Sequence, residues 1–453
     1  MLVRNATLAD GRVRDVRVDG ETIAAVDTGL DADGAVVEAD ERLLLPGMID
    51  AHVHFREPGF SHKETWSTGS RSAAAGGVTT VFDQPNTDPP TVDGRSFDRK
   101  AELASASTVD FAVNGGVTAD WAPAELFERP LGALGEVFLA DSTGEMGIDA
   151  DLFERALERA TEADVPVTVH AEDAALFDDS VRPAAVGGEG DPGRRDADAW
   201  SAYRTAEAEV SAVERACEVA QSLDASLHVA HTSTPESVDV ATDAGMTCEV
   251  TPHHLFLSRA DLVELGTLGR MNPPLRSEER RAALFERLRD GTVDVVATDH
   301  APHTREEKDA DVWAAPSGVP GVETALPLLL EAARTGEVGY ERVRDVTAAN
   351  VADVFELPRK GRVEAGRDAD LVLVDETDPE PIRGERLHSR CGWTPFEGMQ
   401  GVFPDLTMVR GTVVYHDGEW GPSVGENVRS SPSGTRHERH GDHQAGADPG
   451  DVA

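Results

Sequence analysis

The chain has 453 residues, of which 40% are hydrophobic, so it is long enough and apolar enough to bury a large core. Its 84 acidic residues outnumber 42 basic ones, and a net charge of −42 argues against nucleic acid as a partner. No run of about 18 apolar residues occurs, so we expect no membrane span. The three cysteines lie far apart and form neither a metal-binding pair nor a disulfide framework.

The negative charge is spread through every segment, and only four basic residues are lysines: Lys63, Lys100, Lys308 and Lys360. Two interpretations compete, a special acidic binding surface and a whole surface adapted to a very salty cytoplasm. The even spread and the scarcity of lysine favour the second, which is typical of a halophile. The first residues, MLVRNATLADGRVRD, lack the apolar core of a signal peptide, so we expect a cytoplasmic protein.

Short strands with turns are predicted over residues 1–46, and from residue 47 strand-like runs alternate with helical stretches. Eight such runs occur: LLLPGMIDAHVHF, VTTVFDQP, DFAVNGGV, GEVFLA, PVTVHAED, SLHVAHTS, MTCEVTPHHL and VDVVATDHAPH. This alternation predicts a parallel sheet in an α/β fold, and specifically a (β/α)8 TIM-type barrel over residues 47–357. A doubly wound open sheet is the alternative, but no glycine-rich nucleotide-binding loop is in place.

Strands return over residues 358–421, and we expect them to join residues 1–46 in one small composite β domain. Residues 422–453 are rich in Gly, Ser, Asp and His without apolar periodicity, so they are predicted to be a disordered tail. His437, His440 and His443 lie in this tail, where a solvated segment is favoured over a metal-binding one.

Histidines mark the ends of several predicted barrel strands. His52 and His54 alternate in DAHVHFREPG, so they project from the same face of a strand. His170, His231 and Asp299 each lie where another strand gives way to a polar loop. In a barrel these ends converge on the active site, and imidazoles with a carboxylate suit Zn²⁺.

This order of ligands on a barrel resembles the amidohydrolase superfamily, and longer motifs resemble its dihydroorotases. They are DAHVHFREPGFSHKETWSTGSRSAAAGGVTTV, QPNT, HAED, EVTPHHL, NPPLR and ATDHAPHT, and the likeness covers residues 1 to about 421. The resemblance implies zinc-dependent interconversion of L-dihydroorotate and N-carbamoyl-L-aspartate in pyrimidine biosynthesis. It implies a small-molecule substrate and one or two Zn²⁺ per subunit, and it leaves a homo-oligomer open.

Members of this family often bridge two zinc ions with a carboxylated lysine, which this chain lacks. In GEVFLADSTG the corresponding position is Glu136, and Asp141 follows as the alternative bridging carboxylate. An unpaired buried carboxylate is costly, which favours a bridging role for Glu136 over a packing role. If neither residue bridges, a site with a single metal is expected.

The resemblance also implies the residues that hold the substrate. Arg56, Asn86 and His303 would bind its ring carboxylate, Arg56 in bidentate fashion, and Asn272 would contact the ring amide. Asp299 would bind metal and carry a proton from water to the departing ring nitrogen. Taken singly, Arg56 could instead form a surface ion pair, and Asn86 and Asn272 could be turn residues. His300, His253 and His254 are expected to be structural.

Two other functions compete with this interpretation. Allantoinase and dihydropyrimidinase use the same barrel and metals, but their substrates lack the ring carboxylate and do not need an arginine to bind it. An inactive dihydroorotase-like scaffold is the other alternative, and it would have lost metal ligands. All four histidines and Asp299 are present here, and only the glutamate at position 136 favours the scaffold.

Overall fold

The computed structural model describes residues 1–140, 146–183 and 193–430. Its centre is a sheet of eight parallel strands arranged in sequence order, so the predicted barrel is confirmed. The strands are β6 (Met48–Val53), β7 (Val78–Asp83), β8 (Asp110–Gly115), β9 (Leu131–Phe138), β10 (Val167–His170), β11 (His228–Val229), β12 (Thr247–Val250) and β13 (Val295–Val296). Nearly every position in them is buried, as expected for strands covered on both faces.

The sheet closes into a ring where the chain after β13 meets β6. The N–H of His54 donates to the carbonyl oxygen of His300 at 2.8 Å, and the N–H of His300 donates to that of His52 at 3.3 Å. Val53 and His300 also form a parallel β-bridge. Closure therefore places the two histidines of the first strand beside Asp299, which precedes His300 in the chain.

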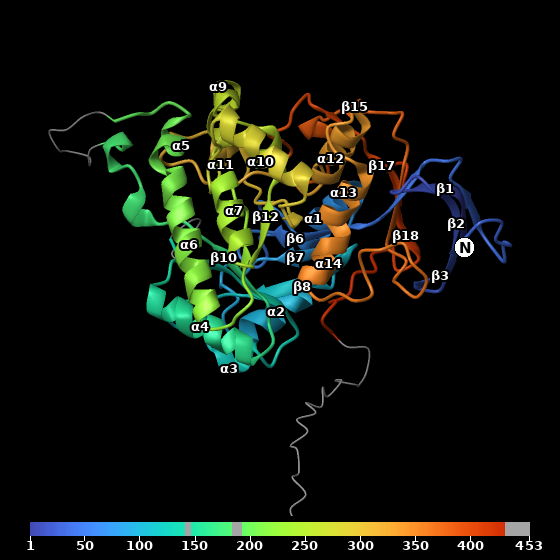
Figure 1. The fold of residues 1–453 in the computed structure, drawn as a ribbon, viewed down its shortest axis with the longest axis horizontal. Coiled ribbons are helices and arrows are strands. Elements are labelled where there is room, and N and C mark those ends of the chain that lie inside the picture. The colour runs from blue at the N-terminus through green and yellow to red at the C-terminus, as the bar shows by residue number, and fades with distance from the viewer. Residues whose placement is uncertain (141–145, 184–192, 431–453) are drawn as a thin grey trace, which may run out of the picture.

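Helices surround the barrel and cover its outer face (Figure 1). Helix α4 (Ala150–Glu162) illustrates how they form: the side chain of Asp149 caps its first turn, and Phe153, Leu157 and Ala160 recur on one buried face. The other long helices are α1 (Trp66–Ala75), α2 (Gly94–Ala104), α6 (Ala206–Ser222), α7 (Pro235–Asp243), α10 (Glu278–Asp290) and α12 (Ala325–Arg334).

Shorter helices lie between these elements: α3 (Pro123–Leu126), α5 (Ala199–Tyr203), α8 (Pro252–Phe256), α9 (Leu262–Leu265), α11 (Arg305–Lys308), α13 (Tyr340–Arg344) and α14 (Asn350–Val354). In the described parts of the chain, no helix has the length and apolar character that crossing a membrane requires.

A nine-stranded mixed sheet lies beside the barrel and draws strands from both ends of the chain (Figure 1). Its strands are β1 (Leu2–Leu8), β2 (Val13–Asp19), β3 (Thr22–Asp27), β4 (Val36–Glu38), β5 (Leu43–Pro46), β14 (Leu371–Val374), β17 (Pro404–Val409), β18 (Thr412–His416) and β19 (Glu419–Trp420). The two ends join where β14 pairs with β5 in antiparallel fashion. A separate pair, β15 (Glu380–Pro381) and β16 (Gln400–Gly401), completes the strands.

Residues 422–430 correct the predicted start of the disordered tail, because they run along the barrel instead. The N–H of Phe111 donates to Glu426 O, and the N–H of Val428 donates to Phe111 O, both at 2.9 Å. Strand β9 pairs with β8 only from Val113 onward, which leaves the backbone of Phe111 open to this segment. Backbone pairing requires no apolar periodicity, so the sequence pattern did not reveal it. Residues 431–453, with the three tail histidines, lie outside the described residues.

A buried group of charges, here called the base cluster, joins the barrel to the nine-stranded sheet. It consists of Lys360, Asp110, Asp368, Asp370 and Arg410. The ammonium of Lys360 lies 2.8 Å from Asp110, 2.6 Å from Asp370 and 3.4 Å from Asp368. Burial alone would lower the pKa of Lys360, but these carboxylates raise it above its usual value. Asp110 opens β8, so the cluster lies at the amino-terminal end of the barrel strands.

Candidate active site and metal centre

The predicted metal ligands meet at the opposite, carboxyl-terminal end of the barrel strands. They come from five of the eight strands or the residues that follow them, and all are buried. We call them the mouth cluster: His52 in β6, His54 just after it, Glu136 in β9, His170 at the end of β10, His231 after β11 and Asp299 after β13. Closure of the barrel thus gathers side chains that are far apart in the sequence.

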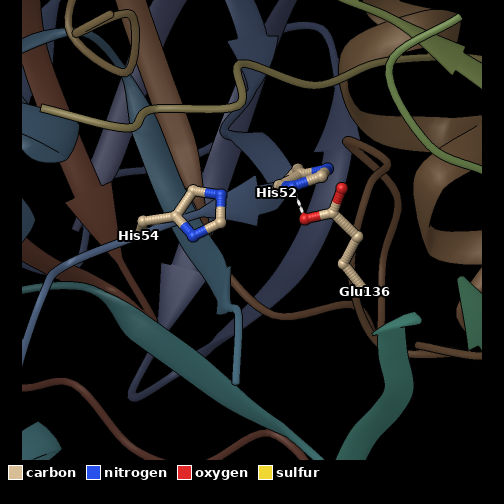
Figure 2. A group of neighbouring side chains, drawn as sticks. All are labelled: His52, His54 and Glu136. Atoms are coloured by element: carbon tan, nitrogen blue, oxygen red, sulfur yellow. Dashed lines mark ion pairs between the residues drawn. The ribbon is translucent and has the colours of Figure 1, made fainter. Parts of the chain in front are cut away.

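Glu136 lies at the centre of the mouth cluster. One carboxylate oxygen, Oε1, lies 2.8 Å from Nδ1 of His170 and 2.6 Å from Nε2 of His231. The other oxygen, Oε2, lies 3.3 Å from Nε2 of His52. Figure 2 shows the carboxylate turned toward His52, with the ring of His54 facing the same space. The two oxygens of one side chain therefore face two different groups of histidines.

Asp299 completes the side of the cluster nearest the first strand. Its Oδ1 lies 2.9 Å from Nε2 of His54 and 3.7 Å from Nε2 of His52. Burial would raise its pKa, but the contacts with these histidines lower it to about 2. The pKa of Glu136 is likewise lowered despite burial, because His52 and His231 favour its charged form. Both carboxylates are therefore ionised at neutral pH.

Three residues of the site adopt backbone conformations that L-amino acids rarely take. The φ angles are 66° at Arg56, 34° at His231 and 45° at Asp299. Such residues cost of order 1 kcal/mol or more each and persist where the surroundings fix them. Here each directs its side chain from a strand end into the mouth.

The mouth cluster fits divalent metal ions. His52, His54 and Glu136 form one group of ligand atoms within 4.8 Å of one another, and Glu136, His170 and His231 form a second. Within the described residues, no lysine or arginine forms an ion pair with Glu136 or Asp299, and Nε2 of His52 has no hydrogen-bond partner. Buried carboxylates without a counter-charge are costly, and imidazole with carboxylate suits zinc. The alternative bridge, Asp141, lies outside the described residues.

Sequence reasoning missed Glu249, which orients His52 of the first group. Its Oε1 lies 2.6 Å from Nδ1 of His52, and its Oε2 lies 3.2 Å from Nε2 of His228. The contact leaves Nε2 of His52 to face the cluster, and a carboxylate on the far nitrogen strengthens an imidazole ligand. A glutamate inside the apolar strand MTCEV was the signal that could have revealed it.

Glu172 plays the same part for the second group and was also missed. Its Oε2 lies 3.0 Å from Nε2 of His170, which leaves Nδ1 of that ring for Glu136. The guanidinium of Arg204 pairs with Glu172, and both side chains are buried. Burial would raise the pKa of Glu172, but Arg204 and His170 hold it well below its usual value. A charged residue two positions after a strand-end histidine was the available signal.

A small pocket opens onto the mouth cluster, and the predicted substrate residues lie around it. Arg56, Asn86 and Asn272 line it together with every metal-ligand candidate of the mouth cluster except His52, and His303 contacts Arg56. Oδ1 of Asn86 lies 2.7 Å from Nδ1 of His54, so this amide also fixes a ligand ring. The structure therefore brings all the predicted residues of the described chain to one place.

Arg56 supplies a cation to a pocket that is otherwise rich in carboxylates. Only 4% of its surface is exposed, and burial lowers its pKa to about 10, so it stays protonated at neutral pH. Its Nε donates to Pro302 O at 3.2 Å. The buried ion pair between Lys100 and Asp83 fixes the backbone next to Arg56, because the carboxylate of Asp83 accepts a hydrogen bond from the N–H of Phe55 at 2.6 Å. The arginine is thus fixed at its base and presented to the pocket.

His303 is held neutral beside this arginine. Nζ of Lys63 lies 3.1 Å from its Nδ1, and a guanidinium nitrogen of Arg56 lies 3.2 Å from its Nε2. The same Nε2 lies 2.9 Å from Ser317 O. Burial, together with the neighbouring cations, lowers the pKa of His303 to about 3. The ring therefore adds no positive charge and acts by shape and hydrogen bonding.

Comparison with known proteins identifies the family. Residues 43–414 match the amidohydrolase family. A dihydroorotase of Halobacterium salinarum is 66% identical over 429 residues, which cover 94% of this chain and 99% of the relative. The chain belongs to the dihydroorotases of the amidohydrolase family. A dihydroorotase of Methanosarcina acetivorans is 45% identical over 89% of this chain and 88% of the relative.

Solved structures agree on the fold. An L-hydantoinase (dihydropyrimidinase) from Arthrobacter aurescens has a TM-score of 0.88 at 28% identity, over 94% of this chain and 98% of that one. A dihydropyrimidinase from Brevibacillus agri has a TM-score of 0.85 at 28% identity, over 96% and 99%. These enzymes are more distant in sequence than the dihydroorotases, and the alignments extend over both the barrel and the nine-stranded sheet.

Proposed function

We propose that this protein is a zinc-dependent dihydroorotase that interconverts L-dihydroorotate and N-carbamoyl-L-aspartate. The observation that carries the proposal is the buried guanidinium of Arg56 in the same pocket as the mouth cluster. A chain with a net charge of −42 repels an anionic substrate, so a local cation is needed to bind one. The dihydroorotases among its relatives support the same assignment.

Zn²⁺ would be held by the mouth cluster, with His52, His54 and Asp299 on one side of Glu136 and His170 and His231 on the other. When bound there, zinc activates water as a nucleophile and polarises the amide carbonyl. Two oxygens of Glu136 facing two groups of histidines support a bridging role for this carboxylate and a site for two ions.

Asp299 moves the proton in this proposal. Its carboxylate lies in the pocket and is ionised, so it can accept a proton from the attacking water. It then donates that proton to the ring nitrogen as the C–N bond breaks, and the same steps run backwards when the ring closes. The hydrogen-bonding distance to His54 keeps Oδ1 at the centre of the site.

Arg56 and Asn86 would bind the ring carboxylate of dihydroorotate, with His303 supporting the arginine. A guanidinium binds a carboxylate through two parallel N–H donors, which selects both charge and orientation. Dihydropyrimidine and hydantoin rings that lack the carboxylate would leave this cation unpaired in a buried pocket, which is unfavourable.

A substrate panel tests the assignment against the related cyclic amidases. We expect the purified protein to turn over dihydroorotate faster than dihydrouracil, hydantoin or allantoin. Chelation should abolish this activity and Zn²⁺ should restore it. Faster turnover of a ring without the carboxylate would favour a hydantoinase-type enzyme, and metal-independent binding without turnover would favour a scaffold.

A further inference from the structure

Strand β6 is irregular at the point where it carries its first metal-ligand candidate. The segment of β6 between Asp50 and Val53 is one residue longer than the segment of β7 that lies opposite it. This segment consists of Ala51 and His52. An extra residue of this kind is a β-bulge, which interrupts the ladder and leaves backbone groups without a partner on the neighbouring strand. The carbonyl oxygen of Ala51 lies in this bulge.

Strand β9 has the same irregularity at its own candidate. Its segment between Leu134 and Val137 is one residue longer than the segment of β10 that lies opposite it. This segment consists of Gly135 and Glu136. The N–H of Glu136 donates to a side chain, Oε1 of Gln84, at 2.7 Å. Two members of the mouth cluster, His52 and Glu136, thus lie in bulges, where regular pairing of the strands does not fix them.

A single amide, that of Gln84, reaches both bulges. Gln84 directly follows β7 and is 1% exposed. Its Nε2 donates to the carbonyl oxygen of Ala51 at 3.1 Å. Its Oε1 accepts from the N–H of Glu136 and, at 3.1 Å, from Nδ2 of the buried Asn114. A backbone N–H only donates and a backbone carbonyl only accepts, so these partners fix which end of the amide faces each strand.

The backbone of Gln84 is held as firmly as its side chain. Its N–H donates to Val53 O at 2.9 Å, and its carbonyl oxygen accepts from the buried ammonium of Lys100. Lys100 also pairs with Asp83, the residue before Gln84. A side chain that begins at a fixed backbone and ends in three hydrogen bonds can hold other groups in place.

We propose that Gln84 is a positioning residue for the metal centre, which holds the bulges of β6 and β9 at the separation that zinc binding needs. This inference rests on the proposed function, because it assumes zinc in the mouth cluster. Gln84 does not line the pocket, and it acts through the backbones of Ala51 and Glu136. Ligands that are already in place bind a metal more tightly than ligands that have to be brought together. Loss of the amide therefore appears as weaker zinc binding.

Asn350 offers a matched control at the other end of the barrel. Its Nδ2 donates to the carbonyl oxygen of Asp294 at 2.9 Å, so it too is an amide bound to the backbone of the barrel. Asp294 directly precedes β13, at the amino-terminal end of the strands and away from the mouth. Asn350→Leu removes this amide without touching either bulge.

The test is the zinc affinity of the full-length protein, measured by competition with a chromophoric chelator, so that it needs no turnover. Gln84→Met keeps the length of the side chain and removes its hydrogen bonds. We expect the Kd for zinc to rise about ten- to a hundredfold in Gln84→Met and to stay within about twofold in Asn350→Leu. Denaturant unfolding of the metal-free proteins measures stability separately, since a merely structural role would lower stability and leave the Kd unchanged.

Wild-type zinc affinity in folded Gln84→Met would overturn the proposal, and so would an equal loss of affinity in Asn350→Leu. If Gln84→Met does not fold, Asn114→Leu takes its place. It removes one partner of the Gln84 amide and leaves both links to the bulges, so the Kd should rise about two- to fivefold, as for one lost hydrogen bond. An unchanged Kd in that variant would overturn the proposal.

The same measurements separate this inference from the assignment of the substrate. A wild type that binds no zinc would refute the metal centre and this inference with it. Failure of the dihydroorotase assignment would appear in the substrate panel alone, and the zinc affinities of the variants would still decide the role of Gln84.

Discussion

The two ends of the barrel bury charge in different ways. In the base cluster, the cations come from the chain itself: Lys360 contacts three carboxylates, and Arg410 lies 3.4 Å from Asp110. In the mouth cluster, Glu136 and Asp299 have only histidines as ionic partners among the described residues. The base is a closed ionic network, whereas the mouth holds anionic ligands without a fixed cation.

This difference separates a structural role from a catalytic one. Removing ions from water costs several kcal/mol each, and the base recovers this cost through pairs between barrel and sheet. In the described residues the mouth carboxylates have histidines but no lysine or arginine as ionic partners, and the backbones of Asp299, His231 and Arg56 are strained in addition. The comparison therefore predicts that changes at the mouth abolish turnover, while changes at the base weaken the fold.

The largest expected effect is that of Asp299→Asn. The amide keeps the shape of the side chain but neither carries the proton nor supplies the negative charge, so kcat should fall by about 10³-fold or more. Steady-state kinetics with dihydroorotate measure this, and circular dichroism should show an unchanged fold. Asp110→Asn at the base is the control, and it should keep kcat per folded molecule. Substantial turnover by the Asp299 variant would refute its role as proton carrier.

Lys360→Met should lower the stability of the fold and leave kcat nearly unchanged. It leaves three buried carboxylates without their shared ammonium, so the free energy of unfolding should fall by about 3–5 kcal/mol. Denaturant unfolding measures the loss, and kcat at low temperature should stay near that of the wild type. If this variant were as stable as the wild type, the base cluster would not hold barrel and sheet together as described.

Arg56→Lys should have a smaller effect on activity. Lysine keeps the charge but loses the planar pair of donors, so kcat/KM for dihydroorotate should fall about ten- to a hundredfold. Turnover of a ring without the carboxylate, however slow, should be nearly unchanged, and its rate in the same variant is the control. Equal losses of kcat/KM for both substrates would mean that Arg56 shapes the pocket but does not bind the substrate carboxylate.

The sequence predicted the barrel because its signal is local and repeated. Each strand is a short apolar run, and its end is marked by a polar residue, as at His170 and His231. The candidate ligands could be predicted for the same reason, since parallel strands bring their carboxyl ends to one mouth. Glu136 was harder, because only its correspondence to a family position distinguished it from a buried residue of the strand.

What the sequence did not predict depends on contacts between distant segments. Glu249 and Glu172 act through the far nitrogens of histidines, and no spacing along the chain records that geometry. Trp200 lies in a polar insertion, and only the folded chain places its indole Nε1 2.8 Å from Oδ1 of Asn272. The ordered start of the predicted tail belongs with these cases, because its partner is an open edge of β8.

The most direct test of the account is an anomalous-scattering map of crystals grown with Zn²⁺, measured for the wild type and for Glu136→Gln. We expect two peaks in the wild type, one on each side of the Glu136 carboxylate, and loss of at least one peak in the variant. A single wild-type peak that does not contact Glu136, or no peak at the mouth, would contradict it.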